Sequence, residues 1–302
     1  MHAARSRLEV ERVGDRVSQW RFCDDAGEIL CESDLEALWG DVGPCIGIER
    51  SSLQDVLVAG IEGVPRRLGT SIRSLTQHKE CVTVDFTDGS SRNYDLVVGA
   101  DGVSSTVRAL TLSGMAPIYT GAMAWLSVPP IRPRGLTSLQ FLFGQGHFFG
   151  FCPIGDGRTY GFGNITSPRV PEPFSGRLER LRHRFSHFGG VVQEYLSGLT
   201  CDEQIHCGPI DWVALEHWYS GHVVLIGDAA HASSPMMGEG GCMAMEDANV
   251  VAESLSGNAT VAGALAYVAR RRWLSWVLQE SDAVAWRKRR LSFLDQTIRV
   301  HD

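Results

Sequence analysis

The sequence lacks an excess of positive charge. It contains 28 Lys and Arg residues against 35 Asp and Glu residues, which gives a formal net charge of −7. Proteins that bind nucleic acid neutralise phosphates with basic surfaces. The charge balance therefore argues against a nucleic-acid partner. The hydrophobic share of 44% and the charged share of 21% are ordinary for a globular protein and favour no class by themselves.

The sequence also lacks a metal-binding cysteine pattern. Its eight cysteines include no CxxC pair, and no Cys/His spacing fits a zinc site. His206 and Cys207 follow Cys201, but this spacing is too irregular for metal ligands. We therefore expect no metal site and reduced, mostly buried thiols, as is typical of the cytosol.

No targeting segment or long apolar run is visible. The N-terminal stretch MHAARSRLEVERVGD is charged and has no apolar centre, unlike a signal peptide. No apolar run approaches the roughly 20 residues that a membrane-spanning helix needs. We expect a soluble, cytoplasmic protein without a membrane span.

Strand patterns dominate the first two thirds of the chain. The segments RVSQWRF and EILCES flank a turn at residues 25–27, which predicts a hairpin. The stretch FLFGQGHFFGFCPIGDGRTYGFGNIT is aromatic and punctuated by glycine, which indicates an antiparallel sheet with one face open to a ligand. Residues 260–294 are predicted to be helical.

Two segments share a strand–turn–helix pattern: DLVVGADGVSSTVR and HVVLIGDAAH. Ligands of α/β sheets bind beyond the carboxyl ends of such strands. A carboxylate there, Asp228 in the second segment, can accept hydrogen bonds from sugar-like hydroxyls. The glycines that follow it precede a predicted helix, whose N-terminus favours an electron-rich ligand edge.

A plainer interpretation stays open for both segments. Asp228 and its glycines would then form an ordinary strand-to-helix connection. Asp101 and Gly102 would form a turn, Ser104 or Ser105 would cap a helix, and Arg108 would lie on its surface.

Taken together, the two segments resemble motifs of the flavoprotein aromatic hydroxylases, the para-hydroxybenzoate hydroxylase-like FAD-dependent monooxygenases. DLVVGADGVSSTVR resembles their DG motif, and VLIGDAAHASSPMMGEGGCMAMEDA resembles their GD motif. The ending GEGGCMAMEDA is most similar to the branch of FAD-dependent urate hydroxylases and zeaxanthin epoxidases. IERSSLQDVL is similar to the family's arginine-bearing helix start, and the resemblance runs from about Trp20 to Arg272.

The resemblance implies an α/β fold with an FAD-binding, Rossmann-like three-layer domain. Residues 1–113 would form its first part, residues 114–208 an antiparallel β-sheet substrate domain, and residues 209–302 its second part with C-terminal helices. The family's first βαβ unit, with its GxGxxG turn for the pyrophosphate, is absent. We therefore expect a truncated FAD-binding domain with weakened FAD binding. Leu126 stands where the family usually carries an arginine.

The resemblance also implies a set of cofactor contacts. Arg50 and Gln54 would lie near the pyrophosphate and ribityl chain, Ile72 at the adenine, Asp101 and Gly102 beside both FAD and the nicotinamide, Asp228 on the ribityl chain, and Gly238, Glu239, Gly240, Gly241 and Cys242 at the pyrimidine edge. Pro235 would lie where the flavin hydroperoxide forms.

The function implied is that of an FAD-dependent monooxygenase. It would use NADH or NADPH and O₂ to hydroxylate or epoxidise a small aromatic or other electron-rich molecule. His147 could deprotonate a phenol-like substrate and Tyr160 could hydrogen-bond it. Alternation along the strands lets only one parity of residues face a ligand, and core packing is the plainer role for the sheet aromatics Phe141, Phe143, Phe149 and Phe151. His231 is read as a structural residue beside the cofactor.

Other functions remain open on the sequence alone. A catalytically inactive remnant that binds a ligand or partner is one, and a flavin oxidase or reductase on the same fold is another. The substrate, the choice between NADH and NADPH, and association into a homodimer are not decided by these residues.

Overall fold

The computed structural model describes residues 2–112, 116–235 and 238–257. The chain divides into two compact units: unit 1 holds Met1–Pro65 and Gly121–Pro209, and unit 2 holds Arg66–Thr120 and Ile210–Asp302. Strands β9 (Ile118–Ser127) and β13 (Ile205–Trp212) each run from one unit into the other. The helices predicted over residues 260–294 lie outside the described residues.

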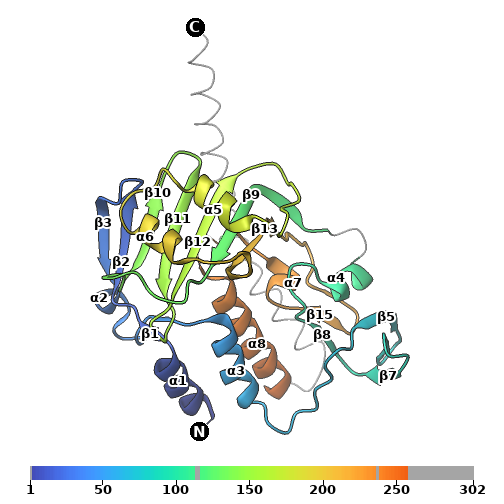
Figure 1. Ribbon diagram of the computed structural model, residues 1–302. Helices are drawn as coiled ribbons and strands as arrows, with labels where there is room; N and C mark the ends of the chain where they lie inside the picture. The colour runs from blue at the N-terminus through green and yellow to red at the C-terminus, as the bar shows by residue number, and fades with distance from the viewer. Residues whose placement is uncertain (1, 113–115, 236–237, 258–302) are drawn as a thin grey trace. The chain divides into compact units, whose positions relative to one another are not determined.

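Unit 1 is built on a seven-stranded sheet with the strand order β13-β9-β12-β11-β10-β2-β3 (Figure 1). Its other strands are β2 (Gln19–Asp24), β3 (Ile29–Asp34), β10 (Leu139–Phe143), β11 (His147–Pro153) and β12 (Thr159–Thr166). β12 pairs antiparallel with β9 and with β11, and β11 pairs antiparallel with β10. β2 pairs with β10 in parallel. The predicted hairpin around residues 25–27 is the β2–β3 pair.

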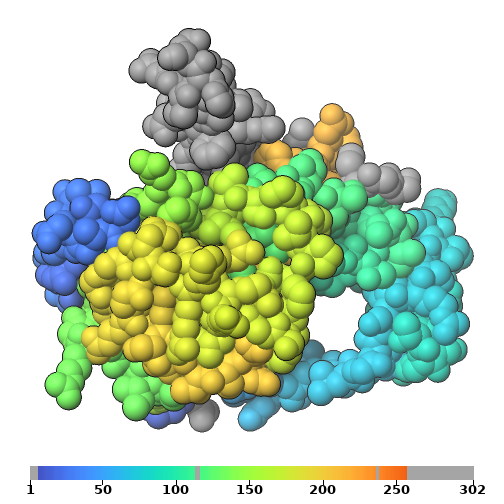
Figure 2. All heavy atoms as spheres, turned by 45° about the horizontal axis from the view of Figure 1, so that its top comes forward, coloured from blue at the N-terminus to red at the C-terminus, as the bar shows by residue number. Residues whose placement is uncertain are grey.

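Helices α5 (Arg177–Arg184) and α6 (Val191–Gly198) cover one face of this sheet (Figure 1), and we call this side the helix-covered face. Their segment, coloured yellow, forms part of the surface that faces the viewer in Figure 2. A Cβ added at Gly161 would lie 2.3 Å from the Tyr195 hydroxyl oxygen, and one at Gly163 would lie 2.5 Å from the Phe185 ring. Glycine on β12 thus lets these rings reach the sheet and complete a buried core with Phe149 and Phe151.

The N-terminal part of unit 1 adds short elements. They are α1 (His2–Val13), β1 (Asp15–Arg16), α2 (Leu35–Trp39), β4 (Ile46–Gly47) and α3 (Arg50–Ala59), with a 3₁₀ turn, η1 (Asp202–Gln204), before β13. Residues 1–65 cluster with the large sheet, because β2 pairs along its length with β10. That residues 1–113 form the first part of the FAD-binding domain stays a prediction.

Unit 2 contains two three-stranded sheets, with the orders β14-β15-β8 and β5-β6-β7. The strands are β5 (Ile72–Gln77), β6 (Val82–Phe86), β7 (Ser91–Tyr94), β8 (Val97–Gly99), β14 (Tyr219–Ser220) and β15 (Val223–Leu225), and the helices are α4 (Thr106–Thr111), α7 (Asp228–His231) and α8 (Gly240–Gly257). β8 and β15, the strands of the two sequence segments with a strand–turn–helix pattern, pair in parallel. The mixed α/β fold is confirmed.

The described residues give two further findings. None of their helices combines the length and the apolar character needed to cross a membrane. Within the same residues, no group of His, Cys, Asp and Glu side chains is arranged to hold a metal ion.

Candidate functional site

Two carboxylates stand beyond the ends of neighbouring parallel strands in unit 2. Val97 pairs with Val223 and Gly99 with Leu225, so β8 and β15 end side by side. Asp101 follows β8 and Asp228 follows β15. Parallel strands present their carboxyl ends at one edge, which is where α/β sheets bind ligands.

The Asp101 carboxylate is engaged with the start of α4. It accepts hydrogen bonds from the backbone N–H groups of Thr106 at 2.7 Å and Val107 at 3.1 Å, and from the Ser105 hydroxyl. Ser105, rather than Ser104, is the cap, since its hydroxyl accepts the Arg108 N–H at 2.9 Å. The Asp101 carboxylate therefore has the role that the turn interpretation gives it, at the connection between β8 and α4. Contact of Asp101 or Gly102 with a cofactor stays a prediction.

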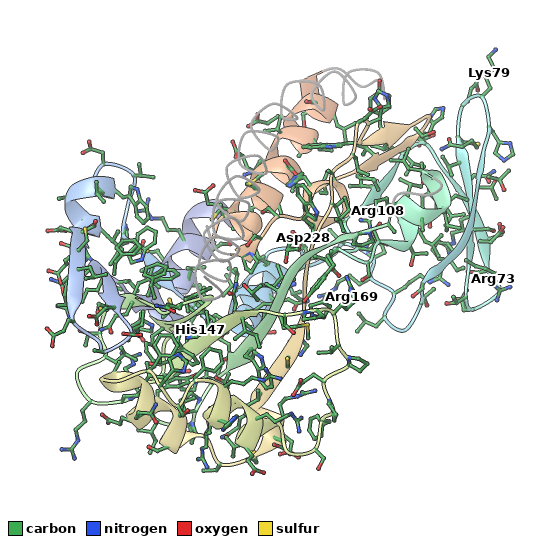
Figure 3. The ribbon with its side chains drawn as sticks, turned by 90° about the horizontal axis from the view of Figure 1, so that it is seen from above. Arg73, Lys79, Arg108, His147, Arg169 and Asp228 are labelled. Carbon is green, nitrogen blue, oxygen red and sulfur yellow. The ribbon has the colours of Figure 1, made fainter. Side chains whose placement is uncertain are left out.

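Arg108 is buried, with only 2% of its surface exposed. Its guanidinium donates to the carbonyl oxygens of Ala229 at 2.9 Å and Val103 at 2.5 Å. The interpretation of Arg108 as a surface residue is wrong, because its long side chain reaches across to the turn after β15. It thereby links the loops that carry Asp101 and Asp228; Arg108 and Asp228 are labelled in Figure 3.

Asp228 is exposed and lies beside the start of α8. A Cβ built on Gly240, the first residue of α8, would lie 3.8 Å from Asp228 Oδ1. The turn that presents Asp228 needs glycine at position 227, where φ is +57° and an added Cβ would lie 2.9 Å from the Ala244 Cβ. The carboxylate and the helix N-terminus are thus held on one small surface.

A buried pair of His231 and Asp247 supports this surface from within. His231 Nε2 and Asp247 Oδ2 are 2.6 Å apart, and the same oxygen accepts the Gly227 N–H at 2.9 Å. The exposed fractions are 3% for His231 and 1% for Asp247, and the Trp218 ring packs on the imidazole at 4.8 Å. His231 therefore has a structural role, as the buried partner of Asp247. Asp247 is fully buried and fixes the turn.

Five further residues predicted to contact the cofactor are exposed at or just before the start of α8: Pro235, Gly238, Glu239, Gly241 and Cys242. Ile72 is apart from them, at the start of β5. The Pro235 carbonyl accepts the Gly238 N–H at 3.1 Å, so the chain turns here before α8. Gly238 has a φ of +69°, and a Cβ at Gly238 or Gly241 would meet no atom within 4 Å. These positions, with Glu239 and Cys242, leave the helix start open.

Arg50 and Gln54 belong to unit 1. They are exposed and one turn apart on α3, so they share a face of that helix. Their predicted contacts with FAD, like that of Ile72, stay predictions.

The two residues predicted to act on a substrate lie on opposite faces of the large sheet. His147 pairs with Ile165 and Tyr160 with Cys152, and side chains alternate between faces along each strand. His147 is on the helix-covered face, where its ring lies 4.1 Å from the His187 ring and 5.5 Å from the Phe188 ring. Burial, then His187, lowers the pKa of His147. It cannot share a ligand with Tyr160 in one pocket.

The face opposite the helices carries a continuous layer of rings, which we call the aromatic face. Its members are Trp20, Phe22, Phe141, Phe143, Phe148, Tyr160 and Phe162. Phe141 and Phe143 had been named from the sequence, whereas Phe149 and Phe151 are fully buried core residues, as core packing predicted. Trp20 and Phe22 could not be placed here from the sequence, because the parallel pairing of β2 with β10 brings them to this face.

Tyr160 is the polar ring of this face. Its ring stacks on Phe162 with 5.4 Å between centroids. Burial raises the pKa of Tyr160 to about 12. The hydroxyl therefore keeps its proton near neutral pH and can act as a hydrogen-bond donor, but not as a base.

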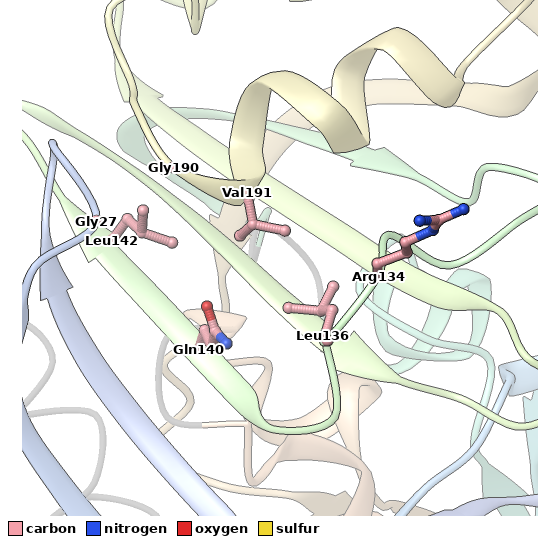
Figure 4. Close-up of a pocket in the computed structure, with 8 residues that line it drawn as sticks. Gly27, Arg134, Leu136, Gln140, Leu142, Gly190 and Val191 are labelled. Carbon is pink, nitrogen blue, oxygen red and sulfur yellow. The ribbon is translucent and has the colours of Figure 1, made fainter.

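A cavity of about 160 Å³ lies on the helix-covered face of the same sheet (Figure 4). Leu136, Leu142 and Val191 line it, and Gln140 and Arg134 are its polar side chains. None of the residues predicted to form the site lines this cavity. Gln140 and Leu142 alternate with the rings of the aromatic face along β10, so they point the other way.

A family model described as "FAD binding domain" matches residues 45–281. The chain belongs to this family. It is 33% identical over 261 residues to the aurachin C monooxygenase/isomerase of Stigmatella aurantiaca, covering 85% of this chain and 68% of that protein. It is 29% identical over 219 residues to the 2-heptyl-3-hydroxy-4(1H)-quinolone synthase of Pseudomonas aeruginosa, covering 72% of this chain and 57% of that protein.

The fold matches a solved flavoprotein. Klebsiella pneumoniae HpxO in complex with FAD and uric acid superposes with a TM-score of 0.82 at 26% identity, covering 90% of this chain and 73% of HpxO. An FAD-dependent urate hydroxylase and a zeaxanthin epoxidase are further relatives, which confirms the resemblance drawn from the motifs. The expected family of FAD-dependent monooxygenases is thus confirmed, while the chain spans only part of the length of its relatives.

Proposed function

We propose that this protein acts as an FAD-dependent monooxygenase that uses NADH or NADPH and O₂ to oxygenate a small aromatic or other electron-rich molecule. When bound, FAD would supply the redox chemistry, namely hydride uptake from the nicotinamide and activation of O₂ for transfer of one oxygen atom. The protein binds the cofactor, orients the substrate and excludes water.

The observation that carries this proposal is the surface formed by Asp228 and the start of α8. The exposed carboxylate can accept hydrogen bonds from the ribityl hydroxyls of FAD. The free N–H groups at the helix start favour the electron-rich pyrimidine edge of the flavin, since they carry the positive end of the helix dipole. The backbone at Gly238 and Gly241 is open, so a flat ring can approach it closely. The residues present therefore fit this part of FAD.

The remaining predicted contacts are part of the same proposal. Arg50 and Gln54 would meet the pyrophosphate and ribityl chain, Ile72 the adenine, and Gly102 the passing nicotinamide. The substrate would lie against the large sheet, with Tyr160 as a hydrogen-bond donor. Supporting substrates come from the relatives: one is named for a 4(1H)-quinolone, and HpxO binds uric acid.

Oxygen labelling tests this activity. The purified chain with FAD, NADH or NADPH and a panel of aromatic compounds is incubated under ¹⁸O₂. The proposal predicts nicotinamide oxidation and a product that carries one ¹⁸O atom. Asp228→Asn should lower the rate, whereas Glu253→Gln, an exposed position of α8, should not.

Two outcomes would contradict the proposal. Nicotinamide oxidation that yields hydrogen peroxide across the whole panel, without a labelled product, would indicate a flavin oxidase or reductase. An absence of nicotinamide oxidation with every compound would indicate a protein that binds without turnover.

A further inference from the structure

We propose that the cavity on the helix-covered face binds a small, uncharged molecule with one aromatic ring and one hydroxyl or N–H donor, of the size and chemistry of phenol. The donor would bond to the side-chain oxygen of Gln140. All residues that line the cavity belong to unit 1, and Tyr160 lies on the other face of the sheet. The site is thus separate from the proposed substrate and cofactor contacts, and the inference does not rest on the proposed function.

The cavity lies where three segments of unit 1 meet. Gly27 belongs to the turn between β2 and β3, Gly190 directly precedes α6, and residues 134–142 supply the third side. The Gly189 N–H donates to the Asp25 carbonyl oxygen at 2.7 Å, which ties the turn to the segment before α6. The walls are therefore held by contacts between separate elements and do not depend on a single loop.

Glycine keeps the rim of the cavity open. Gly27, Gly135 and Gly190 line it with φ values of +97°, +75° and +58°, a backbone region that other residues rarely adopt. A Cβ at Gly135 would meet no atom within 4 Å, so the space beside it is free. Gly135 and Gly190 are exposed, so a ligand can enter from solvent between them.

The inner walls are apolar. Leu136 and Leu142 belong to the buried core and form the base, and Val191, the first residue of α6, lies across from them. Figure 4 shows these three side chains pointing toward a common centre. The volume of about 160 Å³ is close to the roughly 150 Å³ at which an apolar protein cavity takes up benzene. One six-membered ring therefore fits, and burying it removes apolar area from water.

Gln140 gives this apolar space one directed acceptor. Its Nε2 donates to Ser138 Oγ at 2.9 Å, while its Oε1 meets no hydrogen-bond donor among the described residues. Gln140 is half-buried, and Figure 4 shows the oxygen on the side of its amide that faces the cavity. An amide oxygen accepts hydrogen bonds only, so its partner on a ligand must be a hydroxyl or an N–H group.

The residues that line the cavity offer no charged partner to a ligand inside it. Arg134 is at the rim and exposed, and Figure 4 shows its guanidinium turned away from Leu142 and Val191. Its backbone N–H donates to the Glu194 carboxylate at 3.1 Å. A charged ligand group would lose its hydration in the cavity and gain no ion pair. The geometry thus favours a neutral ligand over an anion or a cation.

The test compares three ligands: phenol; toluene, which carries a methyl group of similar size in place of the hydroxyl; and benzoate, which is charged. Calorimetry measures their binding to the full chain and to its variants. Gln140→Leu keeps the size of the side chain and removes the acceptor. Val191→Phe fills the cavity with a ring, and Val170→Phe, at a position with 40% of its surface exposed, is the matched control.

We expect phenol to bind the wild type saturably and more tightly than toluene or benzoate. Gln140→Leu should weaken phenol about 3- to 10-fold, the effect of one neutral hydrogen bond, and should not weaken toluene. Val191→Phe should abolish binding of both rings, because its own ring occupies their space. Val170→Phe should leave phenol unchanged, as should Phe162→Leu on the aromatic face.

Circular dichroism checks that each variant is folded. If Val191→Phe does not fold, Val191→Ile adds a single methylene and should cause a smaller loss of both rings. The inference is overturned by an absence of saturable phenol binding to the wild type, or by benzoate that binds as tightly as phenol. Equal changes for phenol and toluene in Gln140→Leu, an unchanged phenol affinity in a folded Val191 variant, or a loss of phenol in Phe162→Leu would also overturn it.

Discussion

At the scale of single residues, Asp247 has the largest effect on the shape of the cofactor surface. One carboxylate oxygen accepts both the His231 imidazole and the Gly227 N–H, and it does so in a fully buried place. Gly227 precedes Asp228 directly, so Asp247 fixes the turn that presents the exposed carboxylate. A residue on α8 thereby positions the first residue of α7.

We predict that Asp247→Ala lowers the free energy of unfolding by about 1–3 kcal/mol, because the Gly227 N–H and the imidazole would be left buried without an acceptor. Asp247→Asn keeps one acceptor oxygen and should cost less. Urea denaturation of both variants measures the change, with the exposed Glu253→Gln on the same helix as the control. If Asp247→Ala were as stable as the control, the turn would not depend on this carboxylate.

The sequence predicted some of these residues and not others. Asp228 was identifiable because an acid after a short apolar strand is a local signal. Asp247 was not, because a carboxylate inside a helix pattern normally faces water, and its burial depends on a partner 16 positions earlier. Arg108 was misjudged for the same reason: its acceptor, the Ala229 carbonyl, is 121 positions away.

At the scale of elements, the packing of α5 and α6 decides which side of the large sheet is free. Alternation along β11 and β12 predicted that one parity of residues faces a ligand, but it could not say which. Gly161 and Gly163 admit Tyr195 and Phe185 to one face. His147 falls on that face, and Tyr160 on the other.

The position of α5 depends on a carboxylate from outside the helix. Asp202, in η1, accepts the backbone N–H groups of Gly176 and Leu178, both at 2.7 Å, at the start of α5. These bonds satisfy N–H groups that a helix leaves free in its first turn. The hydrogen bond from Leu178 is the main cause that lowers the pKa of Asp202.

We predict a pH-dependent loss of stability for Asp202→Asn. A carboxyl group whose pKa is lower in the folded than in the unfolded state stabilises the fold above the unfolded pKa, and this contribution is lost as pH falls through the folded pKa. The variant should thus be less stable than the wild type at pH 7, and the difference should shrink as pH falls below the ordinary pKa of 3.8 and through the lower pKa of the folded state.

Urea denaturation at pH 7 and at pH 2.5 measures this difference, with Glu203→Gln, an exposed neighbour in η1, as the control. A difference between wild type and Asp202→Asn that is equal at both pH values would show that the charge of Asp202 does not hold the start of α5.

At the scale of the whole molecule, the two surfaces with assigned roles belong to different units. The surface of Asp228 and the start of α8 lies in unit 2, and the aromatic face lies in unit 1. In the described part of the chain, β9, β13 and the step from residue 65 to 66 carry the chain from one unit to the other. The proposed FAD contacts come from both units, since Arg50 and Gln54 belong to unit 1 and Asp228 to unit 2, so each set of substitutions is tested by itself.

The measurement that tests the central claim most directly is an FAD titration of the purified chain, followed by desalting and a visible absorbance spectrum. The account predicts that the residues present suffice for the wild type to retain a flavin spectrum, although the sequence predicts weakened FAD binding. Asp228→Asn should bind FAD about 10- to 100-fold more weakly, because it loses charge-assisted hydrogen bonds, while Glu253→Gln should bind it like the wild type. A colourless wild-type protein, or equal FAD affinity in Asp228→Asn, would contradict the account.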